Sequence, residues 1–315
     1  MWKSSLARDV MVTRLITVRP DDLVLDCIDL LLQNGISGAP IVDGDQYVGM
    51  FSEKSCWRTL IELNEALTES ESSRLQLVSA KDIMRTNLLT FSPATDTLEA
   101  TDQLVAHRVS GGPVVDCDGI WNGNFSEHTA MKALLDMAMH QTPPGTVSSY
   151  MDRDQARLVH PGNPLEQIVE QFQETQYRRF PVVEHGRLVG QISRRDVLQA
   201  ALGCLVGSVD NDPQGLTDQR RTTALRSGQN RQVKDIRSDT AATVEEDFDL
   251  LRIVRLFHNT SARRLPVLRG NSVIGQVSRR DVLQKAIGIF PDDSSLETPQ
   301  PLYLSSNGGS FPLSG

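Results

Sequence analysis

Two stretches of this chain repeat each other almost letter for letter. Residues 177–199 and 262–284 share an Arg-Arg pair shortly before a Pro-Val, a central Gly-Gln and a closing Ser-Arg-Arg-Asp-Val-Leu-Gln. In both stretches the glycine follows the proline by nine positions, the serine by twelve and the aspartate by fifteen. A repeat this regular means that one structural unit is built more than once, so it constrains the fold more than any local pattern.

The same frame occurs twice more, less strictly, in the first half of the chain. Residues 37–52 run from Ser-Gly-Ala-Pro to Val-Gly-Met-Phe-Ser, and residues 110–126 run from Ser-Gly-Gly-Pro to Asn-Gly-Asn-Phe-Ser. The prolines of the four copies are 73, 68 and 85 residues apart along the chain. The sequence therefore predicts four copies of one unit.

Each copy shows the same order of predicted elements. A short apolar strand (15–18, 88–91, 157–160 and 242–244) precedes a helix with apolar residues at helical spacing. A hairpin with a Gly- or Asp-rich turn follows, and a second helix opens at a serine that is a suitable N-cap. A β-α-β-β-α unit of this size buries little apolar surface alone, so we expect the units to pair.

This unit resembles the CBS domain, named after cystathionine beta-synthase, which occurs in tandem as Bateman modules. The most specific part of the resemblance is the Gly-x-hydrophobic-Ser-x-x-Asp run of the third and fourth copies. The resemblance implies an α+β fold of four repeats in two pseudo-twofold modules. One module would span 1–140, with repeats at about 8–66 and 78–140; the other would span 141–290, with repeats at about 146–206 and 230–290.

Two segments outside the repeats are expected to be less ordered. About 35 residues separate Asp196 from Val233, which is long for a connection and indicates partial mobility. Residues 291–315 are rich in Ser, Gly and Pro, a composition that predicts a disordered tail.

The run from Ser193 to Asp196 lies where a strand is predicted to lead into a helix. Free backbone N–H groups and the positive end of a helix favour an anion there, phosphate above all. Ser193 can donate its hydroxyl to a phosphate, and Arg195 can form charge-assisted hydrogen bonds to it. Asp196, one turn later on the same face, is an acceptor suited to the paired hydroxyls of a ribose. The run therefore predicts a nucleotide site.

The family resemblance implies further residues for this site. In CBS families the aspartate binds ribose, the serine or threonine binds phosphate, and adenine lies near the first strand and the segment before Pro-Val. By this resemblance the adenine pocket of the third repeat would be lined by Leu158, Val159, His160, Arg179 and Phe180. The fourth repeat would use Ser278, Arg280 and Asp281, together with Ala242, Thr243, Arg264 and Leu265.

A structural interpretation of the same run is also open, because Ser-x-x-Asp at a helix start is a capping arrangement that needs no ligand. The first two copies depart from the pattern. Ser55 and Thr129 stand at the aspartate position, and Glu53 and Glu127 replace the first arginine of the pair. Such a glutamate would repel phosphate. We therefore interpret repeats 1 and 2 as structural or degenerate, and expect residues 146–290 to hold nearly all of the nucleotide affinity.

Composition narrows the class of protein. The formal net charge is −8, which argues against a nucleic-acid partner, because that partner selects a basic surface. No apolar run is long enough to span a membrane and no apolar signal segment opens the chain, so we expect a cytoplasmic protein with no membrane partner. The four cysteines and six histidines show no metal-ligand spacing, so no metal site is predicted.

These features predict a regulatory protein without catalytic activity of its own. No nucleophile elbow, Walker loop or Rossmann glycine run is present. The expected regulatory ligand is an adenine nucleotide (AMP, ADP or ATP), with S-adenosylmethionine as an alternative, and no prosthetic group is expected. Binding between repeats 3 and 4 would change their relative angle, to which an unknown effector protein would respond, and a homodimer is one assembly open to the chain. The alternatives are an interaction scaffold without a ligand and an enzyme with an unrecognised site.

Overall fold

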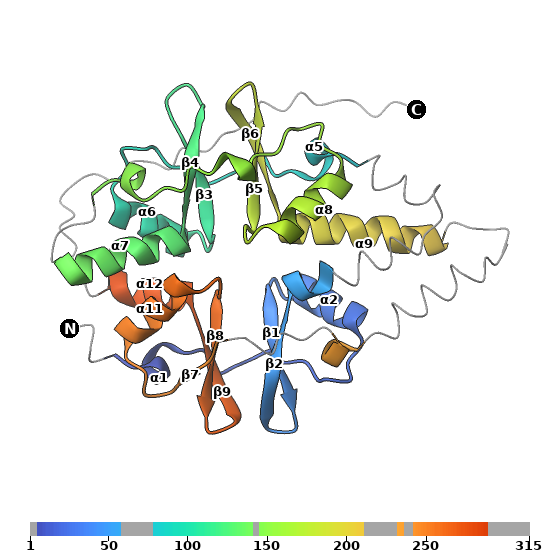
Figure 1. The fold of residues 1–315 in the computed structure, drawn as a ribbon, viewed down its shortest axis with the longest axis vertical. Coiled ribbons are helices and arrows are strands. Elements are labelled where there is room, and N and C mark those ends of the chain that lie inside the picture. The colour runs from blue at the N-terminus through green and yellow to red at the C-terminus, as the bar shows by residue number, and fades with distance from the viewer. Residues whose placement is uncertain (1–4, 58–77, 141–144, 211–231, 236–241, 289–315) are drawn as a thin grey trace.

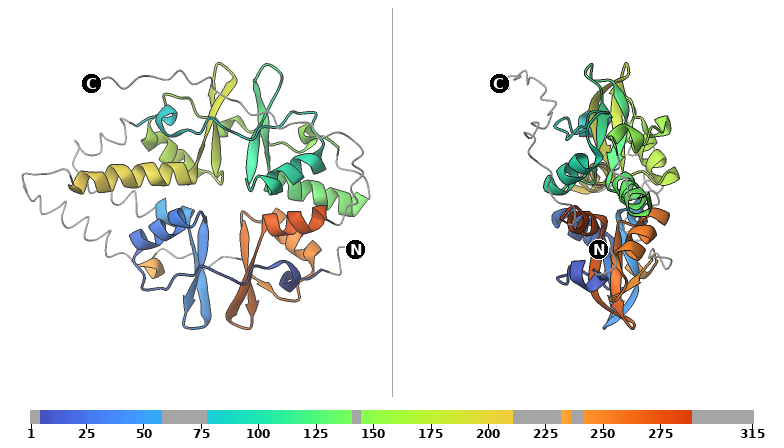
Figure 2. Two further views of the ribbon diagram at one scale, coloured as in Figure 1. Left: turned by 180° about the vertical axis from the view of Figure 1, so that it is seen from behind. Right: turned by 90° about the vertical axis from the view of Figure 1, so that its left-hand side faces the viewer.

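The structure is a computed structural model that describes residues 5–57, 78–140, 145–210, 232–235 and 242–288. The predicted tail, and residues 211–231 of the predicted mobile connection, lie outside these ranges. Figure 1 shows four similar units at the four corners of the molecule, with hairpins above and below and helices between them. The molecule is narrower when it is seen from the side (Figure 2).

The first two repeats contain the following elements. Repeat 1 has α1 (Ala7–Val10), α2 (Val24–Gln33), β1 (Gly38–Asp43) and β2 (Gln46–Ser52), and residues 53–57 begin its second helix. Repeat 2 has α5 (Ala80–Ile83), α6 (Thr97–Ala106), β3 (Gly111–Val115), β4 (Trp121–Ser126) and α7 (Glu127–His140).

Repeats 3 and 4 follow the same order. Repeat 3 has the 3-10 turns η2 (Val147–Ser149) and η3 (Gln155–Arg157), then α8 (Leu165–Glu174), β5 (Arg179–Glu184), β6 (Arg187–Ser193) and α9 (Arg194–Asp210). Repeat 4 has η4 (Val233–Asp235), β7 (Val244–Glu245), α11 (Leu250–Asn259), β8 (Arg264–Arg269), β9 (Ser272–Ser278) and α12 (Arg279–Ile287). The predicted mixture of helices and short antiparallel hairpins, an α+β fold, is confirmed.

The helix that precedes the hairpin of each repeat forms because its apolar residues share one face. In α11 the buried residues run from Leu250 to Phe257 at the helical spacing that the sequence predicts. Asp249 caps this helix, and its carboxylate accepts a 2.8 Å hydrogen bond from the backbone N–H of Arg252. Local sequence is therefore sufficient to place the helix and its start.

The predicted first strands are shorter than expected. In repeats 1 to 3 each is reduced to one parallel bridge, for example between Val18 and Ile41 or between Phe91 and Val114. Only β7 of repeat 4 is a strand, of two residues, that pairs in parallel with β8. A buried valine or phenylalanine at the bridge explains the apolar pattern without a longer ladder.

The repeats pair through their hairpins, but the pairs are not repeat 1 with 2 and repeat 3 with 4. The backbone N–H of Trp121 in repeat 2 donates to the carbonyl of Gly186 in repeat 3 at 3.0 Å. In repeats 1 and 4, β2 lies beside β9, and the N–H of Tyr47 donates to the carbonyl of Asn271 at 2.9 Å. Figure 1 shows the two hairpin pairs, β3–β4 beside β5–β6 and β1–β2 beside β8–β9. We call these module 2/3 and module 1/4.

Short segments before each repeat cross to the partner and hold these modules together. In repeat 2 the residue after Met84, Arg85, forms a β-bridge with Gln191 of β6. In repeat 1 the residue after Met11, Val12, forms the corresponding bridge with Gln276 of β9. A Cβ at Gly190 would lie only 2.5 Å from the sulfur of Met84. Each methionine therefore sits in a space that only a glycine in the partner repeat leaves open.

The assignment of residues 1–140 and 141–290 to separate modules is therefore wrong in this structure, because repeat 2 pairs with repeat 3 and repeat 1 with repeat 4. The physical reason is the length of the connections. Only residues 141–146 lie between α7 of repeat 2 and η2 of repeat 3, and short connections favour neighbours.

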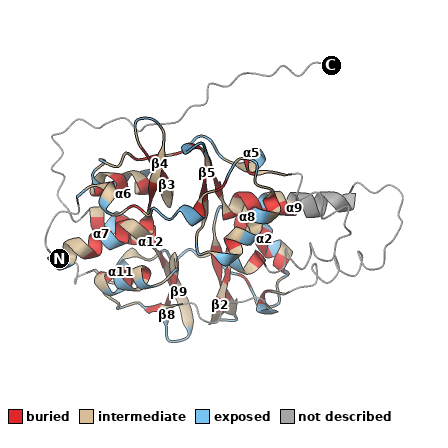
Figure 3. Ribbon diagram, turned by 45° about the horizontal axis from the view of Figure 1, so that its top comes forward, coloured by how far each residue is buried: buried red, intermediate tan, exposed pale blue. Residues whose placement is uncertain are grey.

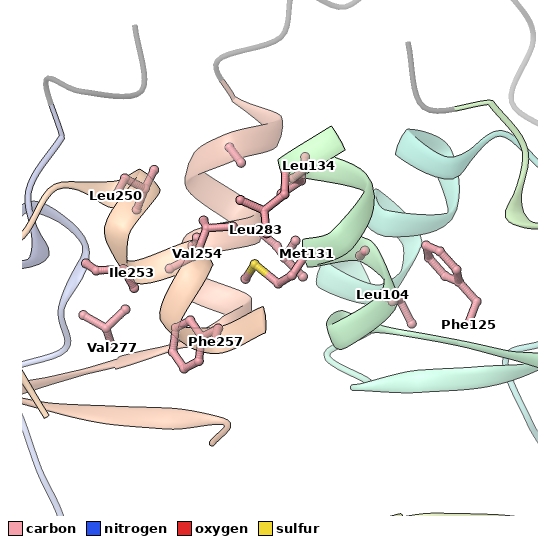
Figure 4. Packing of buried hydrophobic residues seen from close by; sticks show 14 of the residues in the cluster. Leu104, Phe125, Met131, Leu134, Leu250, Ile253, Val254, Phe257, Val277 and Leu283 are labelled. Atoms are coloured by element: carbon pink, nitrogen blue, oxygen red, sulfur yellow. The ribbon is translucent and has the colours of Figure 1, made fainter. Parts of the chain in front are cut away.

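The two modules meet through their helices. One core cluster joins repeats 1 and 3 and contains Ile28, Trp57 and Phe172. The other joins repeats 2 and 4 through α7, α11 and α12, where Met131 and Leu283 pack among Val254 and Phe257 (Figure 4). Figure 3 shows that buried residues gather on these helices between the upper and lower units. Each repeat therefore has one partner through its hairpin and another through its helices.

Candidate functional site

The described part of the structure has four clefts, one for each repeat, and each contains residues from both repeats of one module; clefts 1, 2 and 3 also contain residues of the other module. We number a cleft by the repeat whose second helix opens into it. Cleft 3 (about 430 Å³) combines Ser193, Arg195 and Asp196 of repeat 3 with residues 87–89 and 108–111 of repeat 2. Cleft 4 (about 230 Å³) combines Ser278, Arg280 and Asp281 of repeat 4 with Arg14, Leu15 and Ile16 of repeat 1.

The two remaining clefts belong to the repeats that lack the aspartate. Cleft 2 (about 660 Å³) joins Ser126, His128 and Thr129 to Arg157 and Tyr177 of repeat 3. Cleft 1 (about 530 Å³) joins Ser52, Lys54 and Ser55 to Ala242 and residues 260–264 of repeat 4. Both are open cavities, a property that the residue substitutions in repeats 1 and 2 do not reveal.

The serine and aspartate of clefts 3 and 4 form capping boxes at the starts of α9 and α12. One carboxylate oxygen of Asp196 accepts hydrogen bonds from the hydroxyl (2.5 Å) and the backbone N–H (2.9 Å) of Ser193. The corresponding distances between Ser278 and Asp281 are both 2.7 Å. The capping interpretation is thus correct for both helices. The capping hydrogen bonds use Oδ2 of each carboxylate. The contacts of Oδ1 therefore depend on the residues around it.

The two Oδ1 atoms differ in their surroundings. In cleft 3, Nε of Arg85 donates to Oδ1 of Asp196 at 2.9 Å. In cleft 4 the residue at the place of Arg85 is Val12, because both follow a methionine and bridge to the glutamine of the opposing strand. Asp281 forms no salt bridge with any residue that the structure describes. Asp281 lines cleft 4 together with Arg14 and Arg264.

The adenine wall expected for repeat 3 does not line the cleft of its own aspartate. Val159 and Phe180 are fully packed in the core between repeats 1 and 3, and His160 is exposed, with its Nδ1 accepting from the N–H of Gly162. Of the predicted set only Arg179 lines cleft 3, where it donates to the carbonyl of Gly111 at 2.9 Å. Residues 87–89 and 108–111 of repeat 2 line this cleft instead, because the module places repeat 2 opposite the helix start of repeat 3.

The same correction holds for repeat 4. Leu265 is buried in the core between repeats 2 and 4, and Thr243 is half-buried outside the four clefts. Ala242 lies in cleft 1, opposite the serines of repeat 1. Arg264 lines clefts 1, 3 and 4, so it is the one residue of this predicted wall that reaches Asp281.

The first arginine of each Ser-Arg-Arg-Asp run is a structural residue. Arg194 is buried and donates to the carbonyls of Phe172 (3.2 Å) and Thr175 (3.0 Å) at the end of α8. Arg279 donates to Phe257 and Thr260 at the end of α11 at 2.9 and 2.8 Å. Each therefore satisfies carbonyls that a helix C-terminus leaves free.

The second arginine meets a glutamate from another repeat. Arg195 lies 3.6 Å from the buried carboxylate of Glu53 in repeat 1. Arg280 lies 3.7 Å from the buried carboxylate of Glu127 in repeat 2, which is also 3.6 Å from Arg263. The interpretation of these glutamates as features that only repel phosphate is therefore incomplete, because they balance arginine charge at the centre.

Arginine charge nevertheless dominates cleft 3. Among the residues that the structure describes, the cleft is lined by two acids, Glu53 and Asp196, and by nine arginines: Arg85, Arg108, Arg178, Arg179, Arg194, Arg195, Arg263, Arg264 and Arg280. Burial and the nearby charge of Arg263 lower the pKa of Arg179 to about 10. The same causes, with Arg194, hold the pKa of Arg178 well below its usual value. Depressed arginine pKa values mean that this cluster gains free energy from a bound anion.

Metal and membrane chemistry find no support in the described part of the chain. No group of three or more His, Cys, Asp or Glu side chains there is placed to hold a metal ion. None of the helices in the described ranges combines the length and the apolar character needed to cross a bilayer.

A protein-family model matches all four repeats, and known proteins match parts of the chain. The CBS-domain family model matches residues 7–56, 80–136, 147–203 and 233–288. The uncharacterized protein MJ1225 of Methanocaldococcus jannaschii is 26% identical over 205 residues, which cover 65% of this chain and 68% of that protein. The chloroplastic CBS domain-containing protein CBSX1 of Arabidopsis thaliana is 28% identical over 163 residues, covering 43% of this chain and 69% of that protein.

Solved structures of CBS-domain proteins are also similar. The structure of CBSX2 in complex with AMP is 31% identical and covers 39% of this chain and 96% of its own, with a TM-score of 0.35. The structure of MJ1225 is 20% identical and covers 89% of this chain and 99% of its own, with a TM-score of 0.39. The family model alone matches well over half of the residues in four separate copies, and this protein therefore belongs to the CBS-domain family.

Proposed function

We propose that this protein is a non-catalytic regulatory protein that binds adenine nucleotides, AMP, ADP or ATP, in clefts 3 and 4. The chemistry of cleft 3 carries the proposal. A buried aspartate stands at the start of a helix, where it can accept hydrogen bonds from ribose hydroxyls, and an excess of arginines lines the remaining wall. A ligand with a ribose at one end and phosphate at the other satisfies both.

The position of cleft 3 supports a regulatory role. Its lining comes from all four repeats, with Glu53 from repeat 1, Arg108 from repeat 2, Asp196 from repeat 3 and Arg280 from repeat 4. A ligand that fills cleft 3 would therefore contact both modules at once. A ligand shifts a packing equilibrium only by its differential affinity for the two arrangements, and contacts to every repeat provide that difference. An effector protein that recognises one arrangement would then respond to the nucleotide.

Thermal stabilisation of the full chain tests this proposal. AMP, ADP, ATP and S-adenosylmethionine are added in turn, and a ligand at 100 times its dissociation constant is expected to add about 2.7 kcal/mol to the free energy of unfolding. The Asp196→Asn and Asp281→Asn double variant should lose most of the stabilisation. Asp82→Asn is the matched control, because Asp82 forms the same capping box with Ser79, at 2.8 and 2.5 Å, outside the four clefts.

The capping boxes give the scaffold alternative a specific observation in its favour, since they satisfy Asp196 and Asp281 without a ligand. A scaffold predicts no stabilisation by any of the four ligands, and equal melting losses for Asp82→Asn and for the cleft variants. Consumption of a nucleotide during the titration, followed by chromatography, would instead indicate an enzyme.

A further inference from the structure

The ion pair between Arg85 and Asp196 is a feature that cleft 4 does not share. Arg85 belongs to the crossing segment of repeat 2, and its Nε donates to Oδ1 of Asp196 in repeat 3 at 2.9 Å. The side chain of Arg85 is 67% exposed, whereas that of Asp196 is 7% exposed. An accessible cation thus covers the oxygen that a ribose would need.

The corresponding contact is absent from cleft 4 because the residue type differs. Val12 bridges to Gln276 as Arg85 bridges to Gln191, and both residues follow a methionine packed on a strand glycine. Val12 is 49% exposed and carries no charge. Two clefts with the same Ser-x-x-Asp box therefore differ in whether the carboxylate is already occupied.

Arg85 is held by this one carboxylate at the edge of a cleft that is rich in other cations. Because the Arg85 side chain is largely exposed, solvent screens its side of the ion pair, so a stronger acceptor can displace the carboxylate from Arg85. A phosphate offers that acceptor, because three oxygens with up to two negative charges attract a guanidinium more strongly than one carboxylate oxygen does. A neutral nucleoside offers no acceptor of this kind.

We propose that Arg85 is a specificity-determining residue that makes cleft 3 select phosphorylated over unphosphorylated ligands, whereas cleft 4, with Val12, lacks this selection. The inference rests on the proposed function and names the ligand class of one of its two sites. A nucleoside must break the ion pair without replacing it. A nucleotide releases Asp196 for the ribose while its phosphate takes over Arg85.

Calorimetric titration of full-length protein with adenosine and with AMP tests the proposal. The Asp281→Asn background removes the carboxylate of cleft 4, so that Asp196 is the one remaining aspartate of the two Ser-x-x-Asp boxes at clefts 3 and 4. In that background Arg85→Val, which installs the residue type of cleft 4, should tighten adenosine binding about two- to five-fold and weaken AMP binding. The reciprocal change, Val12→Arg in an Asp196→Asn background, should weaken adenosine binding by a similar factor.

Two results would overturn the proposal: an unchanged or weaker affinity of Arg85→Val for adenosine, or equal loss of affinity for adenosine and AMP. Because Arg85 is exposed, equal melting temperatures of the parent and Arg85→Val proteins are expected, and they confirm that the fold is intact. NMR spectra of the arginine Nε–H groups add a readout without adenosine. The Arg85 resonance should move in Asp196→Asn, and AMP should move it in the same direction in the parent protein.

This design separates the two proposals. If neither adenosine nor AMP binds the parent protein, the proposed function fails, while the response of the Arg85 resonance to Asp196→Asn still reports whether the ion pair forms. If both ligands bind and Arg85→Val leaves their ratio unchanged, the proposed function stands and the role of Arg85 is wrong.

Discussion

The carboxylate of Glu53 lies 3.6 Å from the guanidinium of Arg195, at the point where repeats 1 and 3 meet. These two residues occupy neighbouring positions of the same repeated motif, in different copies. A glutamate in repeat 1 thus balances an arginine in repeat 3, and Glu127 of repeat 2 balances Arg280 of repeat 4 in the same way. The glutamates that replace the first arginine of the motif in repeats 1 and 2 therefore pair with the second arginine of the motif in repeats 3 and 4.

Glu127→Gln should destabilise the protein and at the same time strengthen anion binding. The Glu127 side chain is 6% exposed and pairs with the half-buried guanidinium groups of Arg263 and Arg280, so its loss leaves their charge without compensation. We expect a loss of about 1–3 kcal/mol in the free energy of unfolding, measured by urea denaturation. Added sulfate should restore more of this stability in the variant than in the parent protein.

Glu246→Gln is the matched control for this change. Glu246 pairs with Arg269 at 2.8 Å on the surface, where solvent screens the interaction, so stability should change little. A Glu127→Gln protein that is as stable as the parent, or that gains nothing from sulfate, would contradict the view that Glu127 balances the central arginines.

The pairing of repeat 2 with repeat 3 can be tested with one methionine and one glycine. Gly190→Ala places a Cβ about 2.5 Å from Sδ of Met84, so it should cost about 1–3 kcal/mol through overpacking. Met84→Ala removes the obstacle. The double variant should therefore be more stable than the sum of the two single changes predicts, as measured in a double-mutant cycle.

Met11 and Gly275 provide the parallel cycle for repeats 1 and 4, with the same 2.5 Å approach. The mixed pair, Met84→Ala with Gly275→Ala, should be additive, because these residues belong to different modules. Additivity in the Met84 and Gly190 cycle would show that repeats 2 and 3 are not joined in this way.

A fragment of residues 78–206 should bind AMP in cleft 3, whereas a fragment of residues 146–290 should bind it much more weakly. The first contains the residues that repeats 2 and 3 contribute to cleft 3, including Arg85 and Asp196, and the second lacks the residues from repeat 2. This result reverses the expectation from sequence that residues 146–290 hold the affinity. Calorimetry on both fragments, after circular dichroism shows that each is folded, decides between the two pairings.

Stability should fall between pH 6.5 and pH 4 in part because of His128. Burial, followed by the charges of Arg279 and His258, lowers the pKa of His128 to about 4 in the folded protein. The unfolded chain, with a pKa near 6.5, binds more protons in this window, so the free energy of unfolding rises with pH across it and decreases on acidification. We expect about 1 kcal/mol from this residue, after allowance for its partial exposure to solvent.

Urea denaturation at pH 7.5, 5.5 and 4.5 measures this effect as a difference between parent and variant. His128→Gln should lose less stability on acidification than the parent protein, because glutamine takes up no proton. His160→Gln, at an exposed position, offers a control for the replacement of an imidazole outside the core. Parallel curves for His128→Gln and the parent would rule out His128 as a source of the acid sensitivity.

Much of each repeat could be predicted from local sequence, because local interactions decide it. The apolar face of α11 and the Ser278 cap of α12 both depend on residues within one or two turns. The partner of each repeat could not be found in this way. It depends on contacts such as Met84 with Gly190, which are more than 100 residues apart in the sequence. The short spacing between repeats 2 and 3 was the one available signal.

The residues of the candidate site show the same difference between local contacts, which the sequence predicts, and contacts between repeats, which it does not. Ser193, Arg195 and Asp196 are brought together, as their motif predicts, because they lie within one turn of α9. Val159 and Phe180 were expected in the adenine pocket but lie in the core, because a buried strand residue has the same apolar pattern whether it faces a ligand or the core. Arg85 had no signal in the sequence, since its importance comes from a carboxylate in another repeat.

The pairing of repeat 1 with repeat 4 has a consequence for synthesis on the ribosome. Repeat 1 emerges first, yet the strand β9 and helix α12 that complete its module are encoded at the end of the described chain. At about 5–20 residues per second, roughly 10 to 50 seconds pass between the two. Repeats 2 and 3 can pair during that interval, whereas the apolar surface with which repeat 1 contacts repeat 4 stays exposed to solvent. The first repeat made is the last to find its partner, so chaperone binding to a nascent chain should concentrate on it.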